Sequence, residues 1–213
     1  MAKEIYDVKN PQSFYNMDVT VKLAVEEFQK ANLEEMINNC DFTPTEGGFK
    51  VRFINLNLQV DYPSGDVINS DTGEKVNDTI KVLVLHHAVY SQGGELKADK
   101  ISYKELPGGE IYIDPFTRRC LNALTGIFGA NLDALKKAVA ATDHTEENLG
   151  DYSCTIKVMP KVPITLIVYE ADDEFPASSN ALFNQAAANF LHTEDYNQIT
   201  SYLVSTLKKI AFA

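Results

Sequence analysis

Five acidic side chains toward the C-terminal end are the residues whose types and spacing best suit chemistry. Asp172, Asp173 and Glu174 are adjacent and follow an apolar segment, and Glu194 and Asp195 stand about one helix further along. Carboxylate oxygens are the ligands that hard cations such as Mg²⁺ and Ca²⁺ prefer. If the two groups converge, they form a metal site. A metal-dependent hydrolase that uses Asp172, Asp173 and Glu174 is therefore one interpretation.

The same acids have a structural interpretation, because both groups lie at the start of a predicted helix. Negative charge near a helix N-terminus is stabilising by about 0.3–1 kcal/mol per charge, and the run lacks the alternating acids of a calcium loop. We favour helix capping over metal binding. Three adjacent acids nevertheless exceed what one helix needs, and strand alternation points Asp173 to the same side as Phe175. We expect Asp173 to be buried and to have a cationic or amide partner.

Arginine supplies a candidate for that partner. Arg118 and Arg119 are adjacent in a predicted helix of a chain with 19 lysines and arginines. Guanidinium groups bind carboxylates bidentately, so one of them either holds an anionic ligand at the mouth of a pocket or forms an ion pair with Asp173. We favour the ion pair. The residues predicted to bind a ligand are Arg118, Arg119, Asp173, Glu174 and His86.

His86 and His87 lie in an apolar segment that predicts a buried helix. Neighbouring residues on a helix diverge by about 100°, so the two rings cannot face one metal ion. A histidine on such a helix is more often a hydrogen-bonded core residue than a ligand, and His86 is kept as a binding candidate. The three cysteines are widely spaced, which predicts buried free thiols rather than disulfides or a metal site. No cofactor is identified.

The elements around these residues predict an α+β fold. Near residues 49–69 and 153–170, polar and apolar residues alternate or apolar residues follow one another, as in β-strands. These predicted strands are grouped in two parts of the chain and do not alternate with helices. Neither cluster can bury its apolar face alone, so we expect one antiparallel sheet packed with about five or six helices. The expected helices cover residues 17–39 with a break near Asn32, a segment starting at Asn77, a segment starting at Asp114-Pro115, and residues 131–140, 177–191 and 194–210.

One domain over residues 1–213 is the expected organisation. Residues 1–45 are a possible N-terminal helical arm, and the polar segment 142–150 reads as a linker. Because each cluster of strands needs the other, cutting the chain within 142–150 is expected to give two insoluble halves.

Composition narrows the class of function. The formal net charge of −11 opposes binding to nucleic acid and to an anionic membrane surface. No signal peptide or membrane-spanning segment is evident, which predicts a cytoplasmic protein. The sequence contains no nucleophile elbow, phosphate-binding loop, dinucleotide fingerprint or zinc-protease motif. We therefore expect a binding or accessory protein rather than an enzyme.

Several short motifs resemble a bacterial family of unknown function. They are Leu106-Pro107-Gly108-Gly109, the strand pair around Pro160 and Pro163, Asp173-Glu174-Phe175-Pro176, Leu182-Phe183 and Glu194-Asp195. The resemblance runs from about Phe49 to Leu207. Members of that family occur in anaerobes, alone or fused to a small iron–sulfur-cluster domain, so the resemblance implies accessory work for an iron–sulfur or corrinoid protein. This chain lacks the cysteine-rich segment that would hold a cluster.

Overall fold

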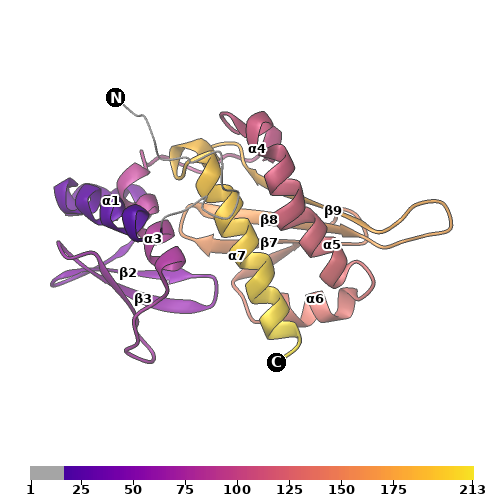
Figure 1. Cartoon of the computed structure of the whole chain (residues 1–213), viewed down its shortest axis with the longest axis horizontal. Coiled ribbons are helices and arrows are strands. Elements are labelled where there is room, and N and C mark those ends of the chain that lie inside the picture. Colours follow the sequence, from indigo (N-terminus) through magenta and orange to yellow (C-terminus); the bar gives the residue numbers. More distant parts are fainter. Residues whose placement is uncertain (1–16) are drawn as a thin grey trace.

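The computed structural model describes residues 17–213 as two antiparallel sheets with helices packed against them (Figure 1). The α+β class is confirmed. The expected single sheet is wrong, because the two clusters of strands form separate sheets of four and five strands. They meet at one backbone hydrogen bond, in which the amide of Ile54 donates to the carbonyl of Val158 at 2.7 Å.

The four-stranded sheet, sheet A, has the order β1-β2-β3-β4 and belongs to the first half of the chain. Its elements are α1 (Met17–Lys30), α2 (Leu33–Cys40), β1 (Thr43–Thr45), β2 (Gly48–Phe53), β3 (Leu56–Asp61), β4 (Asp66–Asn69) and α3 (Asp78–Tyr90). The expected break near Asn32 is confirmed, since the Asn32 side chain accepts hydrogen bonds from the first amides of α2. The part of the possible N-terminal arm before residue 17 lies outside the described residues.

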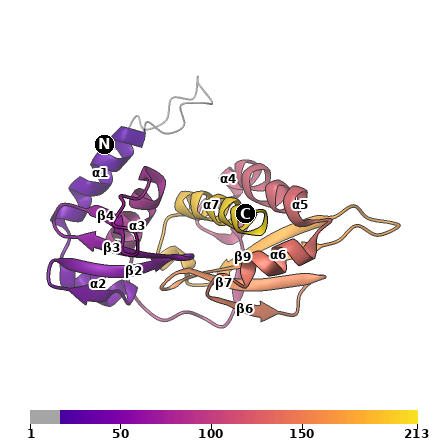
Figure 2. The ribbon, with the colours of Figure 1, turned by 90° about the horizontal axis from the view of Figure 1, so that it is seen from below.

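The five-stranded sheet, sheet B, has the order β5-β9-β8-β7-β6. Its strands are β5 (Lys100–Ser102), β6 (His144–Glu147), β7 (Tyr152–Met159), β8 (Val162–Tyr169) and β9 (Ser178–Asn184). The helices of this half are α4 (Gly109–Phe116), α5 (Asn122–Phe128), α6 (Leu132–Val139) and α7 (Thr193–Ala211), with short helical turns η1 (Tyr103–Glu105), η2 (Thr117–Leu121) and η3 (Ala187–Asn189). Helices α5 and α7 lie on one side of sheet B (Figure 2), and α6 packs against β7 and α7.

Three expected elements differ from the structure. The segment 177–191 is not a helix but strand β9 followed by η3, because Ala181 and Phe183 alternate into the core with strand period. The segment 142–150 is not a bare linker, because it contains β6, which pairs with β7. The helix expected to start at Asp114-Pro115 begins at Gly109, so Pro115 lies inside α4.

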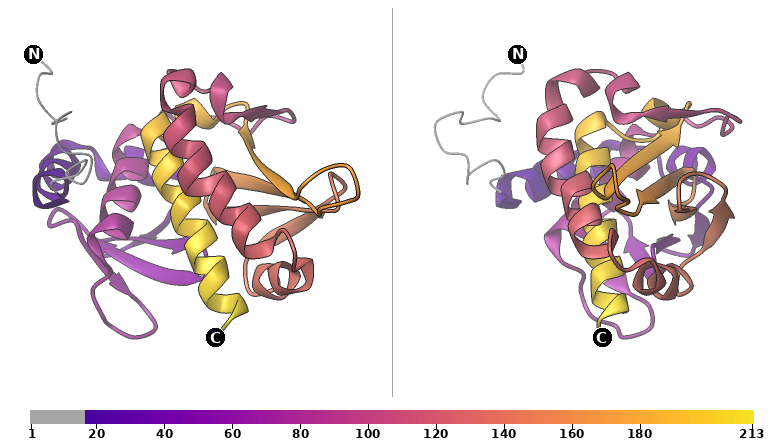
Figure 3. Two further views of the ribbon diagram at one scale, coloured as in Figure 1. Left: turned by 45° about the vertical axis from the view of Figure 1, so that its right-hand side comes forward. Right: turned by 90° about the vertical axis from the view of Figure 1, so that its right-hand side faces the viewer.

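Helix α4 continues through the π-helical turn η2 into α5, and α7 packs along this long helix (Figure 3). Proline lacks an amide hydrogen, so Pro115 interrupts the regular hydrogen-bond ladder of α4, and the π-helical turn begins two residues later. Helix α3 is buried over most of its surface, as its apolar sequence predicts. The core is formed by these helices and the inner faces of both sheets.

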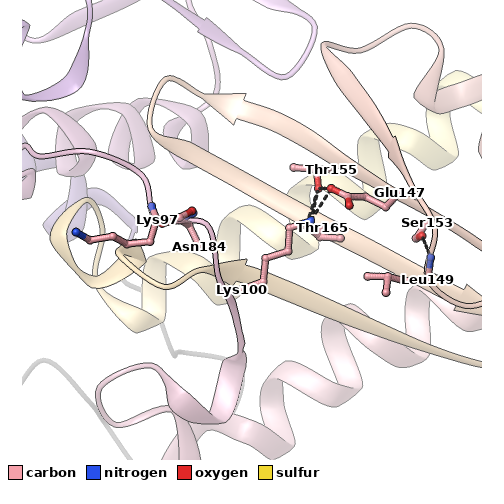
Figure 4. Close-up of polar contacts among 8 residues, drawn as sticks. All are labelled: Lys97, Lys100, Glu147, Leu149, Ser153, Thr155, Thr165 and Asn184. Atoms are coloured by element: carbon pink, nitrogen blue, oxygen red, sulfur yellow. Dashed lines mark hydrogen bonds and ion pairs between the residues drawn. The ribbon is translucent and has the colours of Figure 1, made fainter.

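Sheet B is strongly curled. Lys100 is on the outer strand β5 and Glu147 is on the opposite outer strand β6, yet the Lys100 ammonium contacts the Glu147 carboxylate (Figure 4). Neighbouring strands lie about 4.8 Å apart, so a flat sheet would separate these strands by roughly 19 Å. Lys100 also donates to Thr155 Oγ1 at 3.2 Å, and Thr155 lies 2.7 Å from Thr165. The inside of the curl is therefore closed by a connected polar network.

Candidate functional site

The acids at 172–174 lie in the connection between β8 and β9, and all three side chains are exposed. Asp172 Oδ1 accepts hydrogen bonds from the amides of Glu174 at 2.9 Å and Phe175 at 2.7 Å. These two bonds hold the pKa of the Asp172 carboxyl below its ordinary value, because they stabilise the charged form. Asp172 therefore stabilises a local turn, and no helix follows it.

The expected burial of Asp173 is wrong, since its side chain is exposed in that connection. Arg118 and Arg119 are exposed in the π-helical turn η2, and within residues 17–213 neither forms an ion pair with Asp173. The connection after β8 extends to one end of the molecule in Figure 1, away from the start of α7, so the two acidic groups do not converge. Ligand binding by Arg118, Arg119, Asp173 or Glu174 stays a prediction.

A different acid, Asp195, is the centre of a built cluster. It lies in the first turn of α7, where the helix dipole favours a negative charge, and its side chain is only 5% exposed. Its Oδ1 atom lies 2.8 Å from Nδ1 of His86 on α3. Two helices distant in sequence thus bring a carboxylate and an imidazole into direct contact.

The contact determines which nitrogen of His86 carries a proton. An ionised carboxylate only accepts hydrogen bonds, so Nδ1 must donate and the neutral ring keeps its lone pair on Nε2. Within the described part of the chain no hydrogen bond reaches Nε2, and no fully buried polar side-chain atom there lacks a partner. Nε2 is therefore not completely buried in a side chain that is 15% exposed, and its lone pair can accept a proton or bind an electron-poor centre.

Two aromatic rings extend the cluster around His86. The Tyr90 ring lies 4.9 Å from the His86 ring and stacks on His192 at 4.1 Å, with an interplanar angle of 21°. The Tyr90 hydroxyl donates to Glu27 Oε2 on α1 at 2.6 Å. Burial, this hydrogen bond and the charges of Glu27 and Asp195 raise the pKa of the Tyr90 phenol. Tyr90 therefore stays neutral between the two imidazoles.

A pocket of about 350 Å³ opens beside this cluster at the start of α7. Its lining residues are Pro107, Tyr112, Ala188, Leu191, His192, Thr193 and Glu194. His192 belongs both to the pocket wall and to the stack on Tyr90. The stack thus connects the pocket wall to Tyr90, whose ring in turn contacts His86.

His87, the neighbour of His86, belongs to the core. Its ring nitrogens lie 2.9 Å from the carbonyl oxygen of Pro160 and 3.3 Å from that of Phe190. Complete burial lowers the pKa of His87 to about 4, although both carbonyl contacts oppose the shift. The expectation that the two rings face different environments is confirmed.

The cysteines are buried free thiols, as expected. Burial raises the pKa of Cys120 to about 12, which excludes a reactive thiolate there at neutral pH. Within residues 17–213 there is also no group of three or more histidine, cysteine, aspartate or glutamate side chains arranged to hold a metal ion.

Comparison with known families identifies the family to which this chain belongs. The model of a domain of unknown function, DUF3786, matches residues 32–206, most of the chain. The chain belongs to the DUF3786 family. No curated protein and no solved structure matches this DUF3786 chain. Among its described helices, none has the length and apolar character needed to cross a membrane.

Sequence reasoning identified part of the His86 cluster. His86 was a predicted binding residue, and Asp195 was considered as a metal ligand or capping charge. Tyr90 was missed, although its position four residues after His86 places both on one helix face. Nothing in the sequence indicates the contact with Glu27, because α1 packs on α3 through tertiary structure alone.

Proposed function

We propose that this DUF3786 chain is a binding or accessory protein that presents Nε2 of His86 to a ligand or partner. The observation that carries the proposal is the buried Asp195 carboxylate 2.8 Å from Nδ1. It fixes the tautomer and orientation of the ring, and a fixed ring loses less conformational entropy on binding than a free one. The lone pair of Nε2 is thereby held in one direction.

A metal centre carried by a partner fits this arrangement. Metal-ligating histidines usually donate their other ring N–H to a carboxylate, which orients the ring and raises its basicity. Among the described residues this is the one imidazole backed by a carboxylate, and they hold no three-ligand group of their own. We therefore propose that the partner is an iron–sulfur or corrinoid protein, and that the two meet in the cytoplasm of an anaerobic bacterium, as the family resemblance implies.

The positions of the acids favour this proposal over a metal-dependent hydrolase. Asp172 is engaged by two backbone amides, and Asp173 and Glu174 are exposed on the same connection. Calorimetry with Mg²⁺, Ca²⁺ and Mn²⁺ tests the hydrolase directly. Heat of binding that disappears in Asp173→Asn would favour the hydrolase over the accessory protein.

A visible-absorption titration with aquocobinamide tests the corrinoid form of the proposal. This corrinoid lacks an internal nitrogen base and changes colour when an imidazole binds its cobalt. We expect the wild-type chain to shift the spectrum, His86→Gln to abolish the shift, and Asp195→Asn to weaken binding about tenfold or more.

His144→Gln is the matched control, because His144 lies on β6 and its Nδ1 contacts the carbonyl of Thr142. It should bind as the wild type does. An unchanged spectrum with the wild-type chain would contradict the corrinoid form. An equal shift in His86→Gln would contradict the role of His86. Anaerobic co-purification from the native cell then distinguishes an iron–sulfur partner from a corrinoid partner.

A further inference from the structure

The outer face of sheet A carries two cations that stand apart from the His86 cluster. Lys50 and Arg52 alternate with the buried residues Phe49, Val51 and Phe53 along β2, so both point away from the core. Arg52 is directly opposite Asn57 on β3, and Lys50 is directly opposite Thr43 on β1. Strand pairing therefore gathers two positive charges, an amide and a hydroxyl on one face.

These side chains line a pocket of about 380 Å³. Its lining residues are Thr43, Lys50, Val51, Arg52, Asn57, Leu58, Ser70 and Asp71. The Asp71 carboxylate is held by the Asn57 amide at 3.0 Å, and it forms no ion pair with either cation. The hydroxyls of Thr43 and Ser70 are further possible donors at the rim.

The two cations keep nearly all their hydrogen-bonding capacity. Within residues 17–213 neither Lys50 nor Arg52 forms an ion pair, whereas Lys75 and Lys81 of the same half both contact Asp66. A guanidinium has five N–H donors, and that of Arg52 uses Nε to donate to the carbonyl of Ile54 at 3.1 Å. Both terminal nitrogens of Arg52 therefore remain available, in a chain whose net charge is −11.

A strained turn holds Arg52 in place. Ile54 has a φ of 54°, which is unfavourable for a β-branched residue. Its side chain is fully buried and its amide donates to Val158 of sheet B, so packing and hydrogen bonding maintain the strained conformation. Because Arg52 Nε binds the carbonyl of this fixed residue, the guanidinium plane is oriented before any ligand arrives.

We infer that the outer face of sheet A binds a small oxyanion, a phosphate or carboxylate group of a metabolite, between Arg52 and Lys50. The planar guanidinium binds two oxygens of such a group and the ammonium neutralises its remaining charge. This site shares no residue with the His86 cluster, so the inference does not depend on the proposed function and is tested separately.

Isothermal titration calorimetry with pyrophosphate and, separately, citrate tests the inference and distinguishes phosphate from carboxylate. We expect at least one of them to bind, and Arg52→Gln to weaken that binding roughly tenfold to a hundredfold. Arg52→Lys should recover only part of the loss, because an ammonium cannot bind two oxygens in a plane. Lys50→Gln should weaken binding less than Arg52→Gln.

Lys104→Gln is the control, since it removes one positive charge from an exposed site outside the pocket. It should leave affinity within about twofold, because exposed charges beyond a Debye length of about 8 Å are screened at physiological salt. Equal weakening by Arg52→Gln and Lys104→Gln would overturn the inference and indicate unspecific attraction. Binding of neither anion at millimolar concentration would overturn it too. A circular-dichroism melt confirms that each variant is folded.

Discussion

Two acidic segments of this chain look alike in sequence and differ completely in structure. The run at 172–174 has more acids than the pair at 194–195, yet all of its side chains are exposed. In the pair, Asp195 is buried and contacts His86 at 2.8 Å. The difference comes from what packs over each segment: α3 covers the start of α7, whereas the connection after β8 projects beyond sheet B.

The comparison teaches that the local density of charge is a poor guide to a site. Three adjacent carboxylates in solvent remain hydrated and are satisfied by local turn amides, as Asp172 is. A single carboxylate removed from water needs a partner, and that need fixes a second side chain in space. The predictions below test how sharply the two segments differ.

Asp195→Ala should give the largest effect. Removing the carboxylate leaves the Nδ1 donor of His86 without its acceptor in a mostly buried setting, which costs roughly 2–3 kcal/mol of unfolding free energy. Urea denaturation measures the change, and Asp195→Asn should lose less because its amide oxygen can still accept. A loss equal to that of Asp173→Ala would remove the distinction between the segments.

Acid should destabilise the protein through His87, which lies on α3, the helix that covers Asp195. The folded-state pKa of His87 is about 4, below its ordinary value of 6.5, so the unfolded chain binds more protons between these values. Stability is thus fully present above pH 6.5 and is lost as the pH falls toward 4, by on the order of 2 kcal/mol at pH 5.

Urea denaturation between pH 7 and pH 5 measures this loss, and NMR titration of the His87 ring checks its cause. The ring should stay neutral down to about pH 5. Titration of His87 near pH 6.5 in the folded protein would contradict the assignment. Asp172 contributes little over this range, because its pKa is held below its ordinary 3.8.

Tyr90→Phe tests how far the Asp195 cluster extends. It removes the hydrogen bond to Glu27 and keeps the ring between His86 and His192, so it should cost about 0.5–1 kcal/mol. Glu27→Gln is the companion variant, since it keeps an acceptor for the hydroxyl. A larger loss in Glu27→Gln than in Tyr90→Phe would mean that Glu27 acts through another contact.

The smallest effects should come from the exposed acids, and Asp172 should matter more than Asp173, although the sequence had indicated Asp173 as the buried residue with a partner. Asp172→Ala removes two turn hydrogen bonds, whereas Asp173→Ala removes none of those described. We expect both to change the melting temperature by less than about 2 °C, with Asp172→Ala the larger. Differential scanning calorimetry measures both. A steep fall for Asp173→Ala would revive a specific partner for that residue.

Much of the fold was predictable because local signals determine it. The cap at Asn32, the buried helix α3 and the strand pattern of β2 each follow from a few neighbouring residues. Strand β9 was not predictable in this way, since it lies in the alanine-rich segment 177–191, whose composition favours a helix, and pairing with β8 overrides that preference. The division into two sheets depends on tertiary packing. The alternation of polar and apolar residues within a strand does not show with which other strands it forms a sheet.

Only the part of the site that lies on one helix, α3, was predictable from the sequence. His86 stands out as a polar residue in an apolar helix, but its partner Asp195 is 109 positions away in the chain. First-turn acids are common, and capping explains them without any tertiary contact. Burial of Asp195 therefore becomes evident only when α3 and α7 are placed together.

The curl of sheet B has a consequence for aggregation. An open sheet exposes unpaired amides and carbonyls along its two outer strands, and these can pair with another copy of the chain. Here the outer strands are short, at three and four residues, and the Lys100–Glu147 contact draws them toward each other. Charged side chains on short strands are a common means of blocking such pairing. Losing that contact through Glu147→Ala would relax the curl and leave both edges more open to fibril-like stacking.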